Sequence, residues 1–495
     1  MNPRYSKKST PQPRRSWRAA ASSRRYPWSD TEKAMNLKYL AAAALCACSA
    51  LANAQVLVKN ATLLTLAEGQ DEPFSGYLLA DADGAIVAVG PGSYSGELDY
   101  ATSVVDASGM LVVPGFVSAH NHLWQTAFRG LAIDEELWPW LKALHWTYGD
   151  FFADGDFYWF TLHGAMDQLA HGITTTYSHS QRLGGSEAQY LESLAAEAGF
   201  SQHFVFSYNG NVNQPEQDYR SDFAAFMALS RDYMAQPGAS MLAPAMHSVA
   251  LHGNLPMLKV EMDVAAEYGL GAQFHYLEQY SRREQDRAEW PDLMAAGAVR
   301  KGNSFAHFIH TTDEILDDTA AGGAGMSWNP LSNGRLASGL ADIPGYLERG
   351  IPVGMGVDGA ASADIGDPFE NMRMGMYALR MQHRDAGIMS PLQVMKLHTM
   401  GSAELIGVAD KVGSLEPGKR ADFLVLDPDS PATGALFYPA AHIVATMSAD
   451  NIDAVYVDGK LRVKNGEILE QDMDLVQQEV EKRVADIVAR QQAAQ

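Results

Sequence analysis

Two histidines stand one residue apart at the end of a short apolar run, GFVSAHNHLWQ, over residues 115–125. In an extended strand the side chains of residues i and i+2 lie on the same face, so His120 and His122 can point to one position. Two neutral imidazoles directed at one position are typical of a metal site. Because the chain holds 15 histidines, such a pair also arises from two unrelated polar residues. The metal interpretation therefore depends on further ligands elsewhere in the chain.

Further candidates for metal binding and catalysis stand where other strand-like runs end. His275 lies near the end of GAQFHY, His307 lies in SFAHFI, and Asp358 ends PVGMGVD. Three imidazoles and one carboxylate suit Zn²⁺ or Fe²⁺ and leave a coordination position for water. Glu278 follows His275 by three residues, so a short loop could bring it over that water, and His307 could hold the water from the other side. Taken singly, His275 and His307 are better explained as buried core histidines, and Asp358 as a turn or helix-cap residue, but their joint placement at strand ends favours a site.

The region that must position these residues alternates strand-like and helix-like segments. Eight strand-like runs can be read between residues 114 and 408: GFVSAH, GITTTYSH, HFVFSY, MLAPAMHS, GAQFHY, SFAHFI, AGMSWN and PVGMGVD. Eight βα units in ~250–300 residues are typical of a closed parallel barrel, whose chemistry lies at the C-terminal ends of its strands. An open doubly wound sheet is the alternative, but no Gly-rich phosphate-binding turn follows the first strand. The sequence predicts an α/β fold with a (β/α)8 TIM barrel over residues 114–408.

Both flanks of this region carry a different pattern. Short β-branched runs separated by Asp-Gly and Asn-Gly turns fill residues 55–113 and return over residues 411–468. This spacing indicates antiparallel strands. We therefore expect a small β-sandwich domain built from both chain ends, with the barrel inserted between its halves, and a charged C-terminal helix within residues 469–495.

The first 54 residues read as a leader and a signal peptide. Residues 35–54 show a lysine near the start, an apolar centre and an Ala-x-Ala end, and this centre is shorter than the ~20 residues that span a membrane. Cleavage after Ala54 would export the protein to the periplasm or the medium. Two alternatives stay open: Arg24-Arg25 as a twin-arginine signal and Cys48 as a lipid acceptor.

Composition narrows the chemistry and the partners. Both cysteines of the chain, Cys46 and Cys48, lie in the expected signal peptide, so the exported protein has neither a disulfide nor a thiolate ligand or nucleophile. The formal net charge is −22, which argues against nucleic acid or an anionic membrane as a partner. We expect a small-molecule substrate, no membrane insertion, and leave a homo-oligomer open.

The chain resembles the amidohydrolase superfamily, in the branch that contains cytosine, guanine and S-adenosylhomocysteine deaminases and triazine hydrolases. The resemblance covers nearly all of residues 56–465, in order, and rests on these motifs: PGFVSAHNH, HGITTT, HYLE, AHFIH, WNPLSNGRLASG, GVDGAAS and GSLEPGKRADFLVLD. It implies four metal ligands, namely His120, His122, His275 and Asp358. It also implies that Glu278 and His307 handle protons and that Asp358 helps to activate water.

The resemblance further implies one divalent metal ion, Zn²⁺ or alternatively Fe²⁺. Binuclear members bridge two metals with a carboxylated lysine at the end of strand four, and the corresponding segment MLAPAMHSVALHG contains no lysine. Because Glu278 is present, we expect hydrolytic deamination of a nitrogen heterocycle through a metal-bound hydroxide. The alternative is an amidase or another C–N hydrolase that uses the same site on a substrate other than a nucleobase. A non-catalytic binding barrel is the third possibility, but such relatives typically lose ligands and this chain keeps them.

Two residues after the histidine pair are candidates for substrate binding. Gln125 holds a position similar to that of the glutamine in guanine and 8-oxoguanine deaminases that reads the edge of the heterocycle. Trp124 could pack over the barrel mouth and hold a flat substrate, although a buried tryptophan is more often part of the core.

Overall fold

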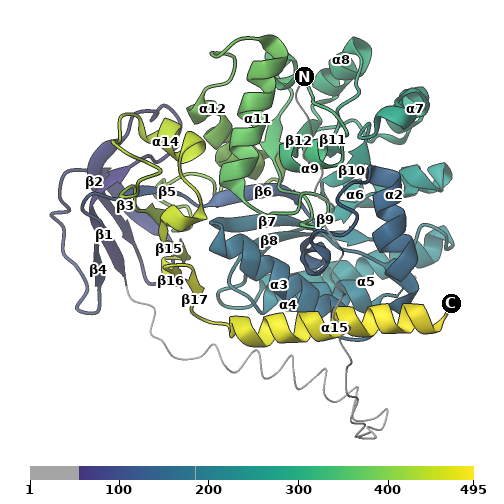
Figure 1. Ribbon diagram of the computed structural model, residues 1–495, viewed down its shortest axis with the longest axis horizontal. Helices are drawn as coiled ribbons and strands as arrows, with labels where there is room; N and C mark the ends of the chain where they lie inside the picture. Colours follow the sequence, from purple (N-terminus) through teal and green to yellow (C-terminus); the bar gives the residue numbers. More distant parts are fainter. Residues whose placement is uncertain (1–54, 184–185) are drawn as a thin grey trace, which may run out of the picture. The chain divides into compact units, whose positions relative to one another are not determined.

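The computed structural model describes residues 55–183 and 186–495. The leader and signal peptide expected over residues 1–54 lie outside the described residues. Two separate sheets, one of eight and one of nine strands, form the framework of the described part (Figure 1).

The eight-stranded sheet is a parallel barrel. Its strands are β6 (Phe116–Asn121), β7 (Ile173–His179), β8 (His203–Asn209), β9 (Met241–His247), β10 (Ala272–Tyr276), β11 (Ser304–His307), β12 (Gly325–Trp328) and β13 (Val353–Met355). They pair in sequence order, and the Asp358 amide donates to the His120 carbonyl at 3.1 Å where the last strand meets the first. All eight predicted strand runs and the predicted (β/α)8 class are confirmed.

Helices separate these strands and cover the outside of the barrel. They are α2 (Leu137–Leu141), α3 (Asp156–Ala170), α4 (Ala188–Ala198), α5 (Glu216–Met234), α6 (Leu255–Glu267), α7 (Arg283–Ala296), α8 (Asp313–Gly322), α9 (Pro330–Arg335), α10 (Ile343–Glu348), α11 (Pro368–His383), α12 (Pro391–Lys396) and α13 (Ser402–Leu405). Short 3-10 or π segments are η1 (Leu123–Phe128), η2 (Lys142–Trp146), η3 (Gly149–Phe151), η5 (Ala250–His252), η6 (Tyr280–Arg282), η7 (Leu397–Gly401) and η8 (Ala449–Asn451).

The barrel strands are buried on both faces, which explains their sequence. Every residue of β7 and β8 is buried, because helices cover one face and the barrel interior fills the other. Polar residues on these strands therefore have to be held by neighbouring groups. The predicted metal ligands and proton-transfer residues lie among the polar side chains at or just after the strand ends.

The nine-stranded sheet combines both ends of the described chain. Its strands are β1 (Val56–Leu63), β2 (Phe74–Ala80), β3 (Ile86–Pro91), β4 (Ser103–Asp106), β5 (Leu111–Pro114), β14 (Phe423–Leu426), β15 (Ile452–Val457), β16 (Lys460–Lys464) and β17 (Glu467–Ile468). Antiparallel pairing of β5 with β14 joins the two halves, and Val58, Val112 and Phe423 contribute to a separate apolar core. The predicted β domain from both chain ends is thus present, and its limits at residues 113 and 411 stay a prediction. A further helix, α14 (Pro439–Ala445), follows β14.

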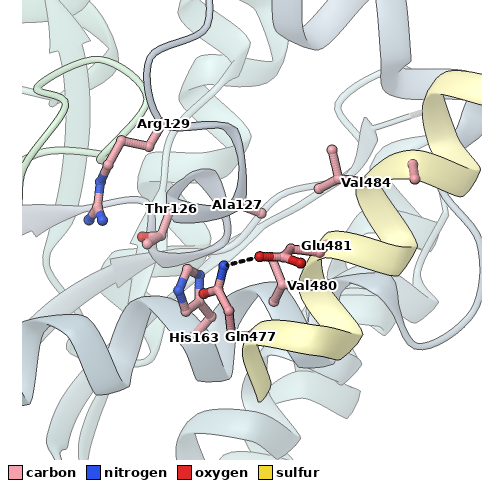
Figure 2. A pocket seen from close by; sticks show the side chains of 9 residues that line it. Thr126, Ala127, Arg129, His163, Gln477, Val480, Glu481 and Val484 are labelled. Atoms are coloured by element: carbon pink, nitrogen blue, oxygen red, sulfur yellow. Dashed lines mark hydrogen bonds between the residues drawn. The ribbon is translucent and has the colours of Figure 1, made fainter. Parts of the chain in front are cut away.

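The C-terminal helix α15 (Met473–Ala493) packs against the α3 side of the barrel (Figure 1). Asp156 of α3 accepts from Arg483 at 2.8 Å and from Arg490 at 3.3 Å. Between α15 and the segment after His122 lies a hollow of ≈ 470 Å³, with Gln477 and Glu481 facing Thr126 and His163 (Figure 2). This hollow contains none of the predicted ligands. Among the described residues, no helix is both long and apolar enough to cross a membrane.

Candidate active site

The four predicted metal ligands converge at the C-terminal ends of three barrel strands. His120 and His122 come from the end of β6, His275 from β10, and Asp358 from the segment after β13. Asp358 Oδ1 lies 3.3 Å from His120 Nε2 and 3.6 Å from His122 Nε2. His122 Nε2 lies 3.1 Å from His275 Nε2. The structure therefore brings the four side chains together as the sequence predicts.

The donor atoms of this cluster fit a divalent metal. His120 Nδ1 is engaged by Gln273 Oε1 at 2.6 Å, while its Nε2 is buried without a hydrogen-bond partner among the described residues. Burial, with the neighbouring histidines, holds the pKa of His122 and of His275 well below the ordinary value of 6.5. Neutral imidazoles with a free Nε2 lone pair are the form that binds metal. The donor atoms of this cluster therefore suit a divalent metal ion.

Asp358 is kept ionised and fixed in orientation. Burial alone would raise the pKa of its carboxyl, but His120, whose Nε2 lies 3.3 Å away, and the surrounding histidines hold this pKa well below its usual range. Ser332 Oγ donates to Oδ2 at 2.6 Å, and the Gly359 amide donates to Oδ1 at 2.8 Å. The Asp358 carboxylate therefore faces His120 and His122 with Oδ1 and His307 with Oδ2.

Glu278 and His307 lie together on the other side of Asp358. His307 Nε2 is 3.8 Å from Glu278 Oε2 and 3.9 Å from Asp358 Oδ2. Burial, with the charge of Asp358, raises the pKa of Glu278 to about 8, and burial lowers the pKa of His307 to about 3. Asn333 Nδ2 donates to His307 Nδ1 at 2.8 Å, which leaves the imidazole proton on Nε2. The pair therefore consists of a carboxylic acid and a neutral imidazole, both able to donate.

Backbone strain marks the same strand ends. Leu277, His307 and Asp358 have φ values of 51°, 68° and 58°, in the left-handed region that costs a residue with a side chain about 1–3 kcal/mol. Each stands at or just after the end of a barrel strand. The strained residues therefore lie where the chain turns Glu278, His307 and Asp358 toward one another.

A cavity of ≈ 400 Å³ opens over the cluster. Its lining includes His122, His275, Glu278, His307 and Asp358 at one end. The segment after β6 contributes a mainly apolar and aromatic part of the lining: Gln125, Leu137, Trp138, Trp140, Leu141, His145 and Trp146. Later strand ends and loops contribute the rest, which is mixed in polarity: Gln181, His247, Val249, Tyr276, Leu277, Gln279, Arg282, Asp286, Leu336 and Ser362. A volume of this size suits a small-molecule ligand.

The two predicted substrate-binding residues have different environments. Gln125 lines the cavity, whereas Trp124 is 1% exposed and packs against Phe128, Phe152 and Phe157 in the core. Both stand on the 3-10 turn η1, where consecutive side chains point about 120° apart. The prediction of substrate contact for Trp124 is therefore corrected: Trp124 supports the turn, and other tryptophans line the cavity.

Several residues that orient the site escaped the sequence analysis. Gln273 Oε1 lies 2.6 Å from His120 Nδ1 and 2.7 Å from His179 Nε2, and its amide donates to the Ala119 carbonyl at 3.0 Å. Gln273 stands two residues before His275 on β10, so the two-residue period of a strand could have indicated it. Ser332 and Asn333, which stand within the motif WNPLSNGRLASG, donate hydrogen bonds to Asp358 and His307.

Comparison with known proteins finds one family model and several deaminases that are similar to this chain. The model of the Amidohydrolase family matches residues 111–462. The chain is 28% identical over 442 residues to a 5-methylthioadenosine/S-adenosylhomocysteine deaminase of Desulforudis audaxviator, covering 88% of this chain and 99% of that protein. It is 26% identical over 443 residues to a 5'-deoxyadenosine deaminase of Methanosarcina mazei, again covering 88% and 99%.

Solved structures share the fold. A zinc-bound adenosine deaminase from Xanthomonas campestris has a TM-score of 0.74 at 20% identity, covering 88% of this chain and 98% of that chain. An atrazine chlorohydrolase from Arthrobacter aurescens in complex with zinc has a TM-score of 0.75 at 22% identity, covering 87% and 100%.

Proposed function

The chain belongs to the amidohydrolase family, and from this premise we propose that it is a hydrolase that deaminates an aromatic nitrogen heterocycle with one divalent metal ion. Its curated relatives include deaminases of adenosine-type compounds. The observation that carries the proposal is the buried Glu278 carboxyl, which stands 3.8 Å from His307 at the edge of the ligand cluster. Loss of an amine from a ring requires a proton at that place.

Four residues would hold the metal: His120, His122, His275 and Asp358. Their three imidazoles and one carboxylate suit zinc, the ion named in two of the similar structures. When bound, a divalent ion lowers the pKa of water toward ~7 and so supplies a nucleophile at neutral pH.

The protein's own residues then divide the proton transfers. Asp358, kept as a carboxylate, accepts a proton from the attacking water. Glu278, kept protonated by burial, delivers a proton to the ring nitrogen or to the leaving amine. His307 directs its Nε2 proton into the same space and stabilises the oxygen that develops on the attacked carbon.

The test is release of ammonia by metal-reconstituted protein from aminated purines, pterins, pyrimidines and triazines. Ammonia from at least one ring class is the expected result, and added chelator should abolish it. Acyclic amides serve as the comparison, because an amidase yields an amine and an acid instead. Turnover of amides alone would replace the deaminase proposal with the amidase.

Export is a further part of the proposal and is supported by the pattern of residues 35–54 alone. Expression of the full chain in a Gram-negative host should place the mature protein in the periplasm. N-terminal sequencing is expected to start at Gln55. An intact leader on cytoplasmic, active protein would contradict export while leaving the enzyme assignment unaffected.

A further inference from the structure

A buried carboxyl that takes no part in the proposed proton transfers supports one side of the cavity. Glu261 stands on α6 and is fully buried. It lies against residues 247–250, which end β9 and begin η5, and His247 and Val249 of this segment line the cavity. Resting on the proposed deaminase function, we infer that Glu261 is a positioning residue whose carboxylate holds segment 247–250 in place for the substrate.

Three donors of segment 247–250 converge on the Glu261 carboxylate. The Ser248 hydroxyl donates to Oε2 at 2.5 Å. The Ala250 amide donates to Oε2 at 3.3 Å, and the Val249 amide donates to Oε1 at 3.4 Å. One side chain therefore binds three consecutive residues just after a barrel strand. An ionised carboxylate has acceptor positions for all three donors, whereas a protonated carboxyl loses some of them.

The other side of segment 247–250 reaches the ligand cluster. The His247 ring lies 5.3 Å from the ring of the candidate ligand His275, measured between centroids. His247 Nδ1 faces the Ser180 carbonyl at 3.3 Å, and the Ser248 amide donates to the Gln273 carbonyl at 3.1 Å. Because Glu261 holds the same segment from behind, its loss should shift lining residues of the cavity and leave the ligands on β6 and β10 in place.

The charge of Glu261 changes near neutral pH. Burial raises the pKa of this carboxyl to about 7, although the hydrogen bonds from segment 247–250 lower it. Tyr219 on α5 faces the same carboxyl and also lowers its pKa, and the pKa of Tyr219 itself is raised by burial, so this phenol stays neutral. On α6, Lys259 and Asp263 pair with each other at the surface. Above about pH 7 the ionised carboxylate therefore accepts all three bonds, and below it the protonated carboxyl does not.

The test compares the zinc-loaded wild type with Glu261→Gln, whose amide keeps the shape but cannot ionise. The substrate is whichever aminated purine, pterin, pyrimidine or triazine releases ammonia fastest. At pH 8 we expect KM to rise roughly fivefold or more, with kcat within about twofold, because segment 247–250 contacts the substrate without transferring protons. The ratio of the two KM values should fall toward one at pH 6, where the wild-type carboxyl is protonated as well.

Amide hydrogen exchange of the same zinc-loaded proteins, without substrate, gives a second readout. At pH 8 the amides of Val249 and Ala250 should exchange roughly tenfold faster in Glu261→Gln than in the wild type, and this difference should shrink at pH 6. Asp263→Asn is the matched control on the same helix, because Asp263 pairs with Lys259 at the surface. It should change neither KM nor exchange.

Ser248→Ala is the second variant, for the case that Glu261→Gln does not fold. It keeps the carboxylate but removes the Ser248 hydrogen bond, which lowers the pKa of Glu261. The pH at which KM falls should therefore move upward from its wild-type value. An unchanged pH dependence of KM in this variant would contradict the role of the carboxylate.

The outcomes separate the two proposals. A KM ratio that stays constant with pH, or a loss of kcat in place of the rise in KM, would overturn the inference about Glu261 while deamination stands. Without ammonia from any ring the deaminase proposal fails, and faster, pH-dependent exchange in Glu261→Gln would still uphold the role of Glu261 in holding the segment. Unchanged exchange would overturn that role in either case.

Discussion

The surroundings of the cluster fix the protonation states of its residues, and Glu278 is held in a form that it would not keep in water at neutral pH. Burial removes the charge from His122 and His275 and places a proton on Glu278, whereas the histidines around Asp358 keep that carboxylate ionised. Two carboxyl groups that lie 3.8 and 3.9 Å from the same imidazole nitrogen, His307 Nε2, therefore have opposite forms. This arrangement lets one of them accept and the other donate a proton.

Glu278→Gln should keep the fold and the metal but lose turnover by roughly 10²–10⁴-fold, the usual contribution of a positioned proton donor. The amide has nearly the same shape, so loss of the proton is the main change. Steady-state ammonia release and metal analysis measure the two effects. Glu284→Gln on the exposed surface of α7 is the control. Wild-type turnover in Glu278→Gln would mean that another group supplies the proton.

His275→Ala and Asp358→Ala should each lose metal and activity while retaining the melting temperature of the metal-free wild type to within a few degrees, because ligands at strand ends are not needed for the barrel core. Elemental analysis of the wild type should give about one divalent ion per chain. His383→Ala, on α11 outside the cluster, is the control. Two ions per wild-type chain would contradict the mononuclear site.

Gln273→Leu should lower metal affinity by roughly 10–100-fold, because His120 loses the acceptor that fixes its tautomer and ring orientation. Competition with a chromophoric chelator measures this affinity. Gln202→Leu is the matched control, since Gln202 is also buried but its amide donates to the Ile173 carbonyl at the other end of the barrel strands. An equal loss of metal affinity in both variants would mean that Gln273 contributes only to packing.

At the scale of elements, the ends of the barrel strands and the turns that follow them decide which side chains meet. The 3-10 turn η1 directs Gln125 into the cavity and Trp124 into the core, and the π segment η2 carries His145 and Trp146. Such π segments are often found at functional sites. The loop after β13 contains the candidate ligand Asp358 and lies against the side chain of Gln125.

Gly359→Ala tests this contact between two loops. A Cβ at residue 359 would come within 1.9 Å of Gln125 Oε1, so the flexible Gln125 side chain should move while the fold persists. We expect KM to rise and metal content to stay unchanged. In a Gln125→Ala background the same change should have little further effect. Gly387→Ala, with its nearest contact at 3.4 Å, is the control. Additive effects of the two substitutions would contradict the contact.

At the scale of the whole molecule, the barrel and the β domain meet at a buried ion cluster. His203 on β8 lies 3.2 Å from Asp458 and 3.5 Å from Asp422, and Arg420 also pairs with Asp458. His203 Nδ1 faces the Ser240 carbonyl, so both ring nitrogens face acceptors. Burial would lower the pKa of His203, but the two carboxylates outweigh it and raise the pKa to about 9.

This raised pKa predicts a pH-dependent stability. In the unfolded chain His203 titrates near its ordinary value of 6.5, so its contribution to the free energy of unfolding is complete below that pH and disappears as pH rises through about 9. The difference in melting temperature between wild type and His203→Gln should therefore shrink from pH 6.5 to pH 9.5. His383→Gln, whose ion pair with Asp342 is partly exposed, should show a small difference throughout. A constant difference for His203→Gln would contradict the charged cluster.

The barrel, the β domain from both chain ends and the candidate ligands could be predicted from the amino-acid sequence. Strand runs such as GFVSAH have a period and a composition that any parallel strand needs, and the fold aligns the ends of such strands on one rim. His120, His122, His275 and Asp358 were therefore recognisable from their places in the chain. Trp124 was not, because its local pattern is the same for a core residue and for a cavity residue.

The neighbours that complete the site could not be predicted in this way. Gln273 touches His120 across 153 residues, and Asn333 touches His307 across 26 residues. The strand period could place Gln273 on the same face as His275, but the partner of each side chain follows from the fold. The direction of a side chain after a strand also depends on strained backbone angles, as at Asp358, which packing of distant elements imposes. Local periodicity specified the strands and their order, whereas close packing between distant segments fixed the cavity, the tryptophans that line it and the protonation states within it.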